Sequence, residues 1–239
     1  MSDFVLVHGA WHGAWCWKRV LPGLWAAGHR AFTVSLTGVG ERAHLAGPGV
    51  GLSTHIEDVV AVIEAEELQH CILVGHSYAG MVITGAAQRL AARIGQLVYV
   101  DASVPLPGEA WSSAHAPETQ AQRRVTITAL GHLPPSPPDV FGLQAEDAEW
   151  VSRHLTPQPG GCYDEPLHFD ADRIAALPRS FIDCTDPALP TIDRARRRVR
   201  EQAGWQVLEI PTGHDAMISA PQALLRHLLA VADAPRGVR

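Results

Sequence analysis

The sequence predicts an α/β fold in which a mainly parallel six-stranded sheet is flanked by helices and carries an inserted helical lid. Six short apolar runs recur along the chain with helix-like segments between them, which is the pattern of strands in a parallel sheet. The alternation breaks between residues 105 and 178, where prolines become frequent. The chain has 239 residues, of which 46% are hydrophobic, enough for a core that needs neither disulfides nor metal.

The apolar runs give the predicted strands: Phe4–Val7, Ala31–Leu36, Cys71–Val74, Leu97–Val100, Ser180–Cys184 and Val207–Ile210. The clearest helix spans Thr54–Glu67, where apolar residues follow the i, i+3, i+4, i+7 spacing and Thr54 with Glu57 has the pattern of a capping box. Two more helices are predicted over Tyr78–Ile94 and Pro221–Ala232. Residues 1–104 and 179–239 therefore form the core of one domain.

The proline-rich segment 105–178 is predicted to be the lid inserted into this core. Gln120–Leu130 and Leu143–Leu155 have the composition of helices within it. Leu133–Val140 contains too many prolines for either regular structure, because proline lacks the backbone donor that helices and inner strands need. We therefore expect this segment to form a short helical lid over one end of the sheet.

The composition excludes several classes of protein. Acidic side chains (25) outnumber basic ones (19), so binding to a nucleic-acid backbone is not expected. No run approaches the roughly 18 apolar residues of a membrane-spanning helix, and the first strand begins at Phe4, before a secretory signal could fit. The four cysteines lack metal-ligand spacing and are expected to be reduced and buried. We expect a cytoplasmic protein without a metal or other cofactor; whether it forms a homodimer stays open.

The strongest functional signal is the stretch CILVGHSYAG, residues 71–80, in which an apolar strand runs into a Gly-His-Ser turn and then a helix. This is the pattern of a nucleophile elbow. The serine of such an elbow occupies a strained turn that closes only if the residues two before and two after it are small. Gly75 and Ala79 meet that need around Ser77. The alternative is an ordinary strand-to-helix turn in which Ser77 merely caps the helix.

A second signal is the stretch HGAWHGAW, residues 8–15, which follows the first strand. Acyl transfer needs two backbone N–H groups aimed at the carbonyl oxygen as it gains charge, and a glycine loop can bring one of them close. We expect the N–H of Ala10 to be one donor and the N–H of Tyr78, at the start of the helix after Ser77, to be the other. His8 is interpreted as a structural histidine that hydrogen-bonds the loop.

The third signal is His214, which follows the last predicted strand in the stretch IPTGHDAM. A histidine this late in the chain suits a general base in the order nucleophile, acid, histidine. Two carboxylates remain open as the acid. Asp186, in the loop after the penultimate strand, is preferred, and Asp101, at the end of the strand Leu97–Val100, is the alternative. Asp183 is a weaker third choice because it lies inside a predicted strand.

Five arginines gather between residues 194 and 200 on a predicted helix between two strands. Runs of like charge on a helix are usually a solvated face. We interpret this run in that way, with a site for an anion or a partner as the alternative.

With these motifs in place, the chain resembles a group of small α/β-hydrolases that includes plant salicylate methyl esterases, hydroxynitrile lyases and bacterial ester- and carbamate-cleaving relatives. The resemblance runs nearly end to end and rests on residues 8–15, on TGVGER at 37–42, on the elbow and on GHDAM at 213–217. It implies an α/β-hydrolase fold with Ser77 as nucleophile and His214 as base. It places the acid at Asp186, although other α/β-hydrolases have theirs at the position of Asp101.

The sequence therefore predicts a serine carboxylester hydrolase that cleaves small aryl, alkyl or carbamate esters without a cofactor, by a Ser-His-Asp triad and an acyl-enzyme. The hydroxynitrile lyases of the group carry a lysine after the catalytic histidine, where this chain has Asp215. A lyase or a small-molecule binding protein on the same fold remains the alternative function. The pocket between elbow and lid is expected to include aromatic side chains, with these candidates: Trp11, Trp111, Phe141, Trp150, Tyr163 and Phe169.

Overall fold

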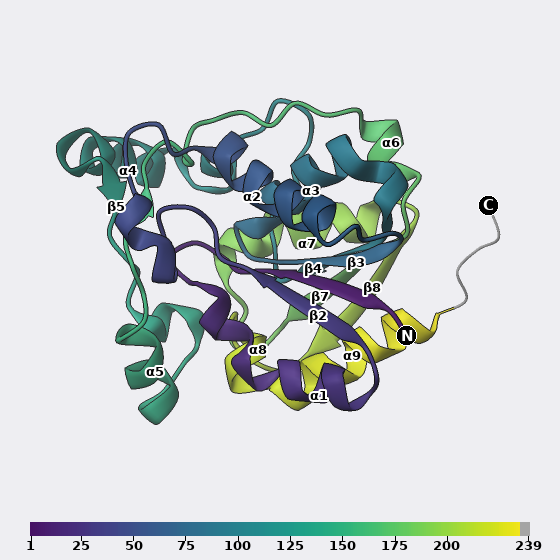
Figure 1. Ribbon diagram of the computed structural model, residues 1–239. Helices are drawn as coiled ribbons and strands as arrows, with labels where there is room; N and C mark the ends of the chain where they lie inside the picture. Colours follow the sequence, from purple (N-terminus) through teal and green to yellow (C-terminus); the bar gives the residue numbers. More distant parts are fainter. Residues whose placement is uncertain (235–239) are drawn as a thin grey trace.

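A parallel sheet forms the centre of the molecule (Figure 1). The computed structural model describes residues 1–234, and within them six strands pair in parallel in the order β2-β1-β3-β4-β7-β8. These strands are β1 (Asp3–Val7), β2 (Arg30–Val34), β3 (Cys71–His76), β4 (Ile94–Val100), β7 (Arg179–Cys184) and β8 (Trp205–Ile210). The predicted strands are thus confirmed. Their ends differ by a few residues, because the last hydrogen-bonded pairs of a strand depend on how far the neighbouring strand extends.

The strand order reverses direction between β1 and β3. The chain first moves outward from β1 to β2, returns to β3 on the other side of β1, and then continues through β4 to β8. In parallel sheets such a switch leaves a crevice at the carboxyl ends of the two strands that flank it. The loop that begins at His8 and the turn that contains Ser77 leave the sheet at this point. The topology therefore brings two of the predicted motifs together.

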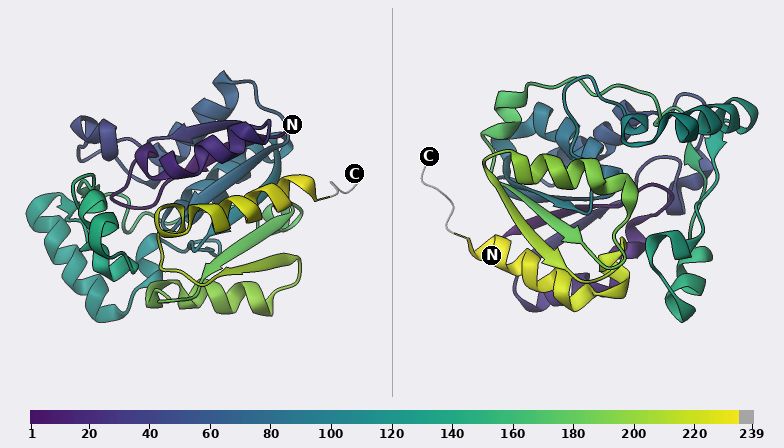
Figure 2. Two further views of the ribbon diagram at one scale, coloured as in Figure 1. Left: turned by 90° about the horizontal axis from the view of Figure 1, so that it is seen from below. Right: turned by 180° about the vertical axis from the view of Figure 1, so that it is seen from behind.

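Helices cover both faces of the sheet (Figures 1 and 2). One face carries α2 (Leu52–Ala65), α3 (Ala79–Leu90) and α7 (Asp193–Glu201), and the other carries α1 (Leu21–Ala26), α8 (Ala216–Ser219) and α9 (Pro221–Asp233). Short 3-10 helices of one or two turns join these elements: η1 (Ala14–Arg19), η2 (Gly40–Leu45), η3 (Ala91–Arg93) and η6 (Pro190–Ile192). Because both faces are covered, the inner strands β1, β3, β4 and β7 are largely buried, and every residue of β3 is buried.

Helix α2 begins two residues before the predicted start. Leu52 is buried and is already helical, and Gly51 is the N-cap. Thr54 therefore occupies the third helical position, where its hydroxyl accepts a hydrogen bond from the Gly51 N–H at 3.3 Å. The predicted Thr54–Glu57 capping box is wrong, since Glu57 instead forms an ion pair with Arg89 of α3.

A long excursion, residues 101–178, connects β4 to β7; its helices α4 and α5 lie beyond the carboxyl end of the sheet, and its last helix, α6, lies beside α3 at the other end (Figure 1). It contains η4 (Trp111–Ala114), α4 (Pro117–Leu130), β5 (His132–Leu133), η5 (Pro138–Phe141), α5 (Ala145–Ser152), β6 (Gln158–Pro159) and α6 (Ala171–Ala175). Helices α4 and α5 match the two helices predicted in this part of the chain. Strands β5 and β6 form a small antiparallel pair within the excursion, between the end of α4 and the segment after α5.

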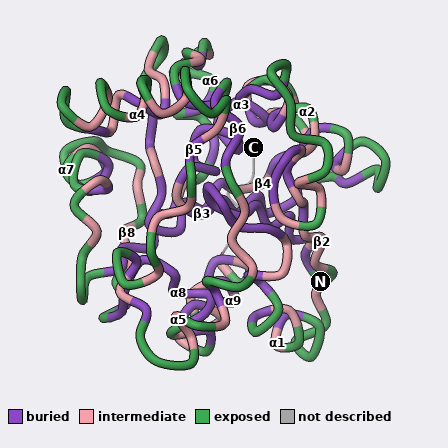
Figure 3. The backbone as a smooth tube through the Cα atoms, turned by 90° about the vertical axis from the view of Figure 1, so that its left-hand side faces the viewer, coloured by how far each residue is buried: buried purple, intermediate pink, exposed green. Residues whose placement is uncertain are grey.

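The core lies between the sheet and its helices, and Figure 3 shows the buried backbone in the centre of the molecule. The largest side chains in it are fully enclosed: Trp17, Tyr78, Tyr99, Tyr163, Phe4 and Phe181. All four cysteines are free and buried, as expected. Among residues 1–234, no helix is both long and apolar enough to cross a bilayer.

Candidate active site

Ser77 occupies a sharp turn between β3 and α3. Its φ angle is +56°, in the left-handed region that a residue with a Cβ atom adopts only when the surrounding structure enforces it. Here the Ser77 N–H donates to the carbonyl of Val100 at 3.2 Å, and the Ser77 carbonyl accepts from the Gly80 N–H at 3.1 Å. A Cβ atom on Gly75 would lie 2.9 Å from the Ala79 carbonyl oxygen. A glycine two residues before the serine is thus required by this turn.

His214 follows β8 and pairs with a carboxylate from the neighbouring part of the sheet. Its Nδ1 lies 2.6 Å from Oδ2 of Asp101, which directly follows β4 and has a φ angle of +42°. Both side chains are buried. A carboxylate is an acceptor, so Nδ1 carries the proton and Nε2 of the neutral ring is left as an acceptor. Ser77 and His214 line the same cavity.

Asp186 does not take this position. It lies in an exposed loop after β7, and its backbone N–H is bonded to the carbonyl of Thr212 at 3.1 Å. Among the described residues, Asp101 and not Asp186 accepts the hydrogen bond from His214 Nδ1. The preference for Asp186 is therefore corrected. The loop after β7 is tied to the β8 loop by its backbone, while the left-handed turn at Asp101 brings that carboxylate to the imidazole.

The second oxygen of Asp101 is held by an arginine that the sequence reading placed on a solvated face. Arg196 of α7 donates from Nη2 to Asp101 Oδ1 at 2.7 Å and from Nε to Asp183 Oδ1 at 2.6 Å. Its Nη1 donates to the Leu189 carbonyl at 2.7 Å. Arg196 is only 8% exposed, so the interpretation of the basic run as wholly solvated is wrong for this residue. The buried face of α7 also includes Val199, three residues after Arg196. Residues three apart share one face of a helix, so the spacing of Arg196 from an apolar valine could have indicated that Arg196 is buried.

Two backbone N–H groups near Ser77 have no hydrogen-bond partner in the described part of the protein. Ala10 follows β1, and Tyr78 precedes the first residue of α3. Within residues 1–234, no hydrogen bond from either N–H to another group is found. A Cβ atom on Gly9 would lie 2.8 Å from the Cβ atom of Ser77, so the loop after β1 contacts the elbow directly. Unpartnered donors beside a nucleophile are what stabilisation of an oxyanion needs.

A buried ion pair supports this loop from behind. Nδ1 of His12 lies 2.8 Å from the Ala10 carbonyl oxygen, and Nε2 lies 3.1 Å from Oδ2 of Asp215. Because both partners are acceptors, both ring nitrogens must carry protons and His12 is an imidazolium. Burial alone would lower the pKa of His12, but the Asp215 carboxylate raises it above its usual value. Burial would likewise raise the pKa of Asp215, yet His12 holds it at about 2.

Two further histidines near the loop are neutral. Nδ1 of His8 donates to the Gly9 carbonyl at 2.8 Å and its Nε2 accepts from the Leu36 N–H at 3.1 Å, which matches the structural role predicted for it. Burial lowers the pKa of His8 to about 3. Nε2 of His76 lies 3.1 Å from the His214 carbonyl oxygen, and burial holds the pKa of His76 well below its usual value.

The same region contains the one grouping within residues 1–234 with the spacing of a metal site. One ligand atom from each of His76, His214 and Asp215 lies within 4.8 Å of the other two. These groups already have partners, since Asp215 binds His12, His76 contacts the His214 carbonyl, and His214 binds Asp101. Hydrogen bonding explains the cluster, and we assign no metal to it.

The cavity in front of Ser77 has a volume of about 60 Å³. Trp11 and Trp111, two of the six aromatic candidates for the pocket, both line it, with ring centroids 5.7 Å apart. Phe141 lines it as well, whereas Tyr163 packs behind Trp111. The remaining aromatic candidates lie elsewhere: Trp150 packs on Trp15, and Phe169 lines a different cavity.

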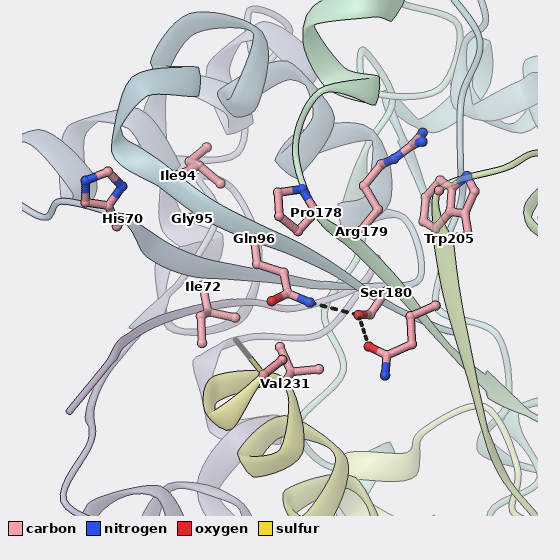
Figure 4. Close-up of a pocket in the computed structure, with 13 residues that line it drawn as sticks. His70, Ile72, Ile94, Gly95, Gln96, Pro178, Arg179, Ser180, Trp205 and Val231 are labelled. Carbon is pink, nitrogen blue, oxygen red and sulfur yellow. Dashed lines mark hydrogen bonds between the residues drawn. The ribbon is translucent and has the colours of Figure 1, made fainter. Parts of the chain in front are cut away.

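A larger cavity, about 570 Å³, lies at the opposite end of the sheet, where β3, β4, β7 and β8 begin (Figure 4). Ser180 lies in its floor, but its hydroxyl accepts from the Gln96 amide and donates to the Gln206 amide, each at 2.9 Å. A serine whose hydroxyl is held by two amides has no base to activate it. The chemistry is therefore expected at the smaller cavity.

Comparison with known proteins agrees with this architecture. The family model described as "Alpha/beta hydrolase family" matches residues 4–227. The chain belongs to this family. A carbendazim-hydrolysing esterase of Nocardioides sp. (strain SG-4G) is 43% identical over 242 residues, which cover 97% of this chain and all of that protein. Methylesterase 2 of Arabidopsis thaliana is 27% identical, in an alignment that covers 97% of this chain and 96% of that protein.

Solved structures of this family have the same fold. An extracellular α/β-hydrolase from a Paenibacillus species, described as sharing homology with tobacco salicylic acid binding protein 2, superimposes with a TM-score of 0.83 at 22% identity. The superposition covers 96% of this chain and 98% of that one. The resemblance noted in the sequence is confirmed, and this member of the α/β-hydrolase family is an ester-hydrolysing enzyme.

Proposed function

We propose that the protein hydrolyses small carboxylic and carbamic esters through a triad of Ser77, His214 and Asp101. The observation that carries the proposal is the 2.6 Å contact between His214 Nδ1 and Asp101 Oδ2, made by a histidine that lines one cavity with the strained Ser77. Asp101 fixes the tautomer in which Nε2 accepts a proton. Similarity to an esterase that acts on carbendazim supports the inclusion of carbamates.

In the first half of the reaction, the Ser77 hydroxyl oxygen attacks the ester carbonyl while its proton passes to His214 Nε2. The carbonyl oxygen becomes an oxyanion, which accepts hydrogen bonds from the N–H groups of Ala10 and Tyr78. When the bond to the leaving alkoxide breaks, His214 returns the proton to it, and an acyl or carbamoyl group remains on Ser77.

In the second half, a water molecule gives a proton to His214 and attacks the acyl carbonyl. Ser77 leaves and recovers its proton, and the acid is released. The excursion 101–178 would act as the lid over this cavity, because Trp111, Phe141 and Arg123 reach the cavity from it. The small volume favours a short or flat acyl group.

The alternative of lyase chemistry has less support. A departing cyanide needs a cation beside the base, but the residue after His214 is Asp215, whose buried carboxylate is bonded to His12. A pure binding protein would have no need for a strained serine and a carboxylate-oriented histidine beside one cavity. Ester hydrolysis is the function that uses all of these groups.

The proposal is tested by turnover of p-nitrophenyl acetate by the parent protein and by Ser77→Ala. A fluorophosphonate label located by mass spectrometry identifies the reactive side chain independently. We expect turnover to fall to background in Ser77→Ala and the label to be found on Ser77. Equal turnover by both proteins, or a label on another residue, would reject the proposed nucleophile.

A further inference from the structure

Arg123 is a charged side chain in the wall of the proposed active-site cavity. It belongs to α4 of the excursion and lines the cavity together with Ser77 and His214. The carbon of its guanidinium lies 5.7, 5.5 and 5.6 Å from the ring centroids of Trp11, Trp111 and Tyr163, respectively. Three aromatic rings therefore surround the cation and shield it in part from solvent.

This cation has no carboxylate partner within the described part of the chain. Its Nη1 donates to Nε2 of His115 at 3.0 Å, so His115 is neutral at that nitrogen and brings no negative charge. Burial, assisted by Arg123, lowers the pKa of His115 to about 4. The next residue, Arg124, differs: it binds both oxygens of Asp164, each at 2.9 Å, on the exposed side of α4.

The lack of a carboxylate partner matters because the Arg123 guanidinium is partly desolvated. Burial is the main influence on the pKa of Arg123 and lowers it below the usual arginine value. A guanidinium in such surroundings gains most from an anion that can take two of its N–H groups, and a carboxylate has the matching geometry. Within the cavity, Arg123 has N–H donors beyond the one bonded to His115.

We propose that Arg123 determines substrate specificity and that the preferred esters carry a free carboxylate, as in half-esters of small dicarboxylic acids. The inference rests on the proposed function and adds the class of ester to it. The carboxylate binds Arg123 while the ester carbonyl lies at Ser77, and the volume of about 60 Å³ limits the linker to a few carbons. Arg123 acts on binding and takes no part in bond making.

The test compares monomethyl succinate with dimethyl succinate, which share a carbon skeleton but differ by one negative charge. In the parent protein we expect kcat/KM to be higher for the half-ester. In Arg123→Gln the ratio of the two kcat/KM values should fall by about 30-fold or more, because a partly buried charge pair is lost. Arg124→Gln is the matched control on the same helix and should leave the ratio unchanged. An unchanged ratio in Arg123→Gln overturns the proposal.

Two measurements keep this result separate from other failures. Arg123→Lys retains the charge and should keep a preference for the half-ester even if the glutamine variant does not fold. Loss of the preference in a folded lysine variant alone would mean that the substrate carboxylate binds two N–H groups of the planar guanidinium and that charge alone is not enough. Equal loss of the preference in Arg124→Gln would overturn the proposal. Binding of succinate to Ser77→Ala, measured by calorimetry, does not require turnover. If the parent protein fails to cleave p-nitrophenyl acetate, the proposed function fails, whereas succinate binding that does not depend on Arg123 rejects this inference alone.

Discussion

Asp101 joins His214 to Arg196, with one carboxylate oxygen 2.6 Å from the imidazole Nδ1 and the other 2.7 Å from the guanidinium Nη2. The acid of the proposed triad is thus shared between the base and a buried cation. Arg196 also binds Asp183, a second buried carboxylate whose other oxygen accepts from Arg200. The arginine donates to both carboxylates and fixes the plane in which Asp101 meets the imidazole.

Replacing Arg196 by methionine is expected to alter both stability and the pH profile. Asp101 loses its guanidinium and Asp183 keeps only Arg200, so the free energy of unfolding should fall by about 3–5 kcal/mol. With the positive charge gone, Asp101 would favour the protonated imidazole more strongly, and the acid limb of kcat/KM should move to higher pH by roughly one unit. Arg197→Met, on the exposed side of the same helix, is the control. A profile that stays in place in the folded Arg196→Met variant would limit Arg196 to a structural role.

Asp101→Asn should lower kcat by about 10⁴-fold, because an amide holds the histidine in the wrong tautomer without removing its hydrogen bond. Asp186→Asn should change kcat by no more than a few-fold, since Asp186 is exposed and His214 is already paired with Asp101. Turnover of p-nitrophenyl acetate measures both variants, and circular dichroism checks that each is folded. A large loss in Asp186→Asn with a small loss in Asp101→Asn would reverse the assignment.

The proposed nucleophile and base could be singled out from the sequence because their signals are local. An apolar strand, a glycine two residues before Ser77 and a following helix describe the elbow without reference to the rest of the chain. His214 is similarly marked by its place after the last strand. The six strands were predictable for the same reason, since buried parallel strands are short apolar runs bounded by polar turns.

The acid and its arginine could not be predicted, because their relationship is three-dimensional. Asp101 and Arg196 are far apart in sequence and meet only because α7 packs against the end of β4 and β7. From the sequence, Asp101 and Asp186 both follow strands that end at the same edge of the sheet. The choice of acid between them depends on the left-handed backbone at Asp101, which no pattern of residues in the sequence predicts. The role of Arg123 depends equally on how the excursion folds over the sheet.

The buried pair of His12 and Asp215 predicts a stability that depends on pH. The pKa of Asp215 is lowered to about 2 from its usual 3.8, so its contribution is present above pH 3.8 and is lost as the pH falls toward 2. The pKa of His12 is raised from 6.5, so its contribution is present below pH 6.5 and is lost as the pH rises through the raised value. By linkage, the shift at Asp215 corresponds to about 2 kcal/mol.

Asp215→Asn should therefore lower the melting temperature most between pH 4 and 6.5, with a smaller difference from the parent protein on either side of that range. Melting temperatures of both proteins across this pH range provide the measurement. A difference that stayed constant from acid to alkaline pH would mean that the two side chains are not an ion pair in the folded protein.

Gly9→Ala should separate the loop after β1 from the elbow. The added Cβ atom would lie 2.8 Å from both the Ser77 Cβ atom and His76 Nδ1, a distance that forces one segment to move. Moving the loop displaces the Ala10 N–H from the oxyanion, and the loss of one such donor lowers kcat by about 10²–10³-fold. Gly47→Ala is the matched control, because a Cβ atom there meets nothing within 4 Å. Since the elbow and its triad remain, KM should change much less than kcat. A variant that retains full kcat would show that Ala10 is not a donor to the oxyanion.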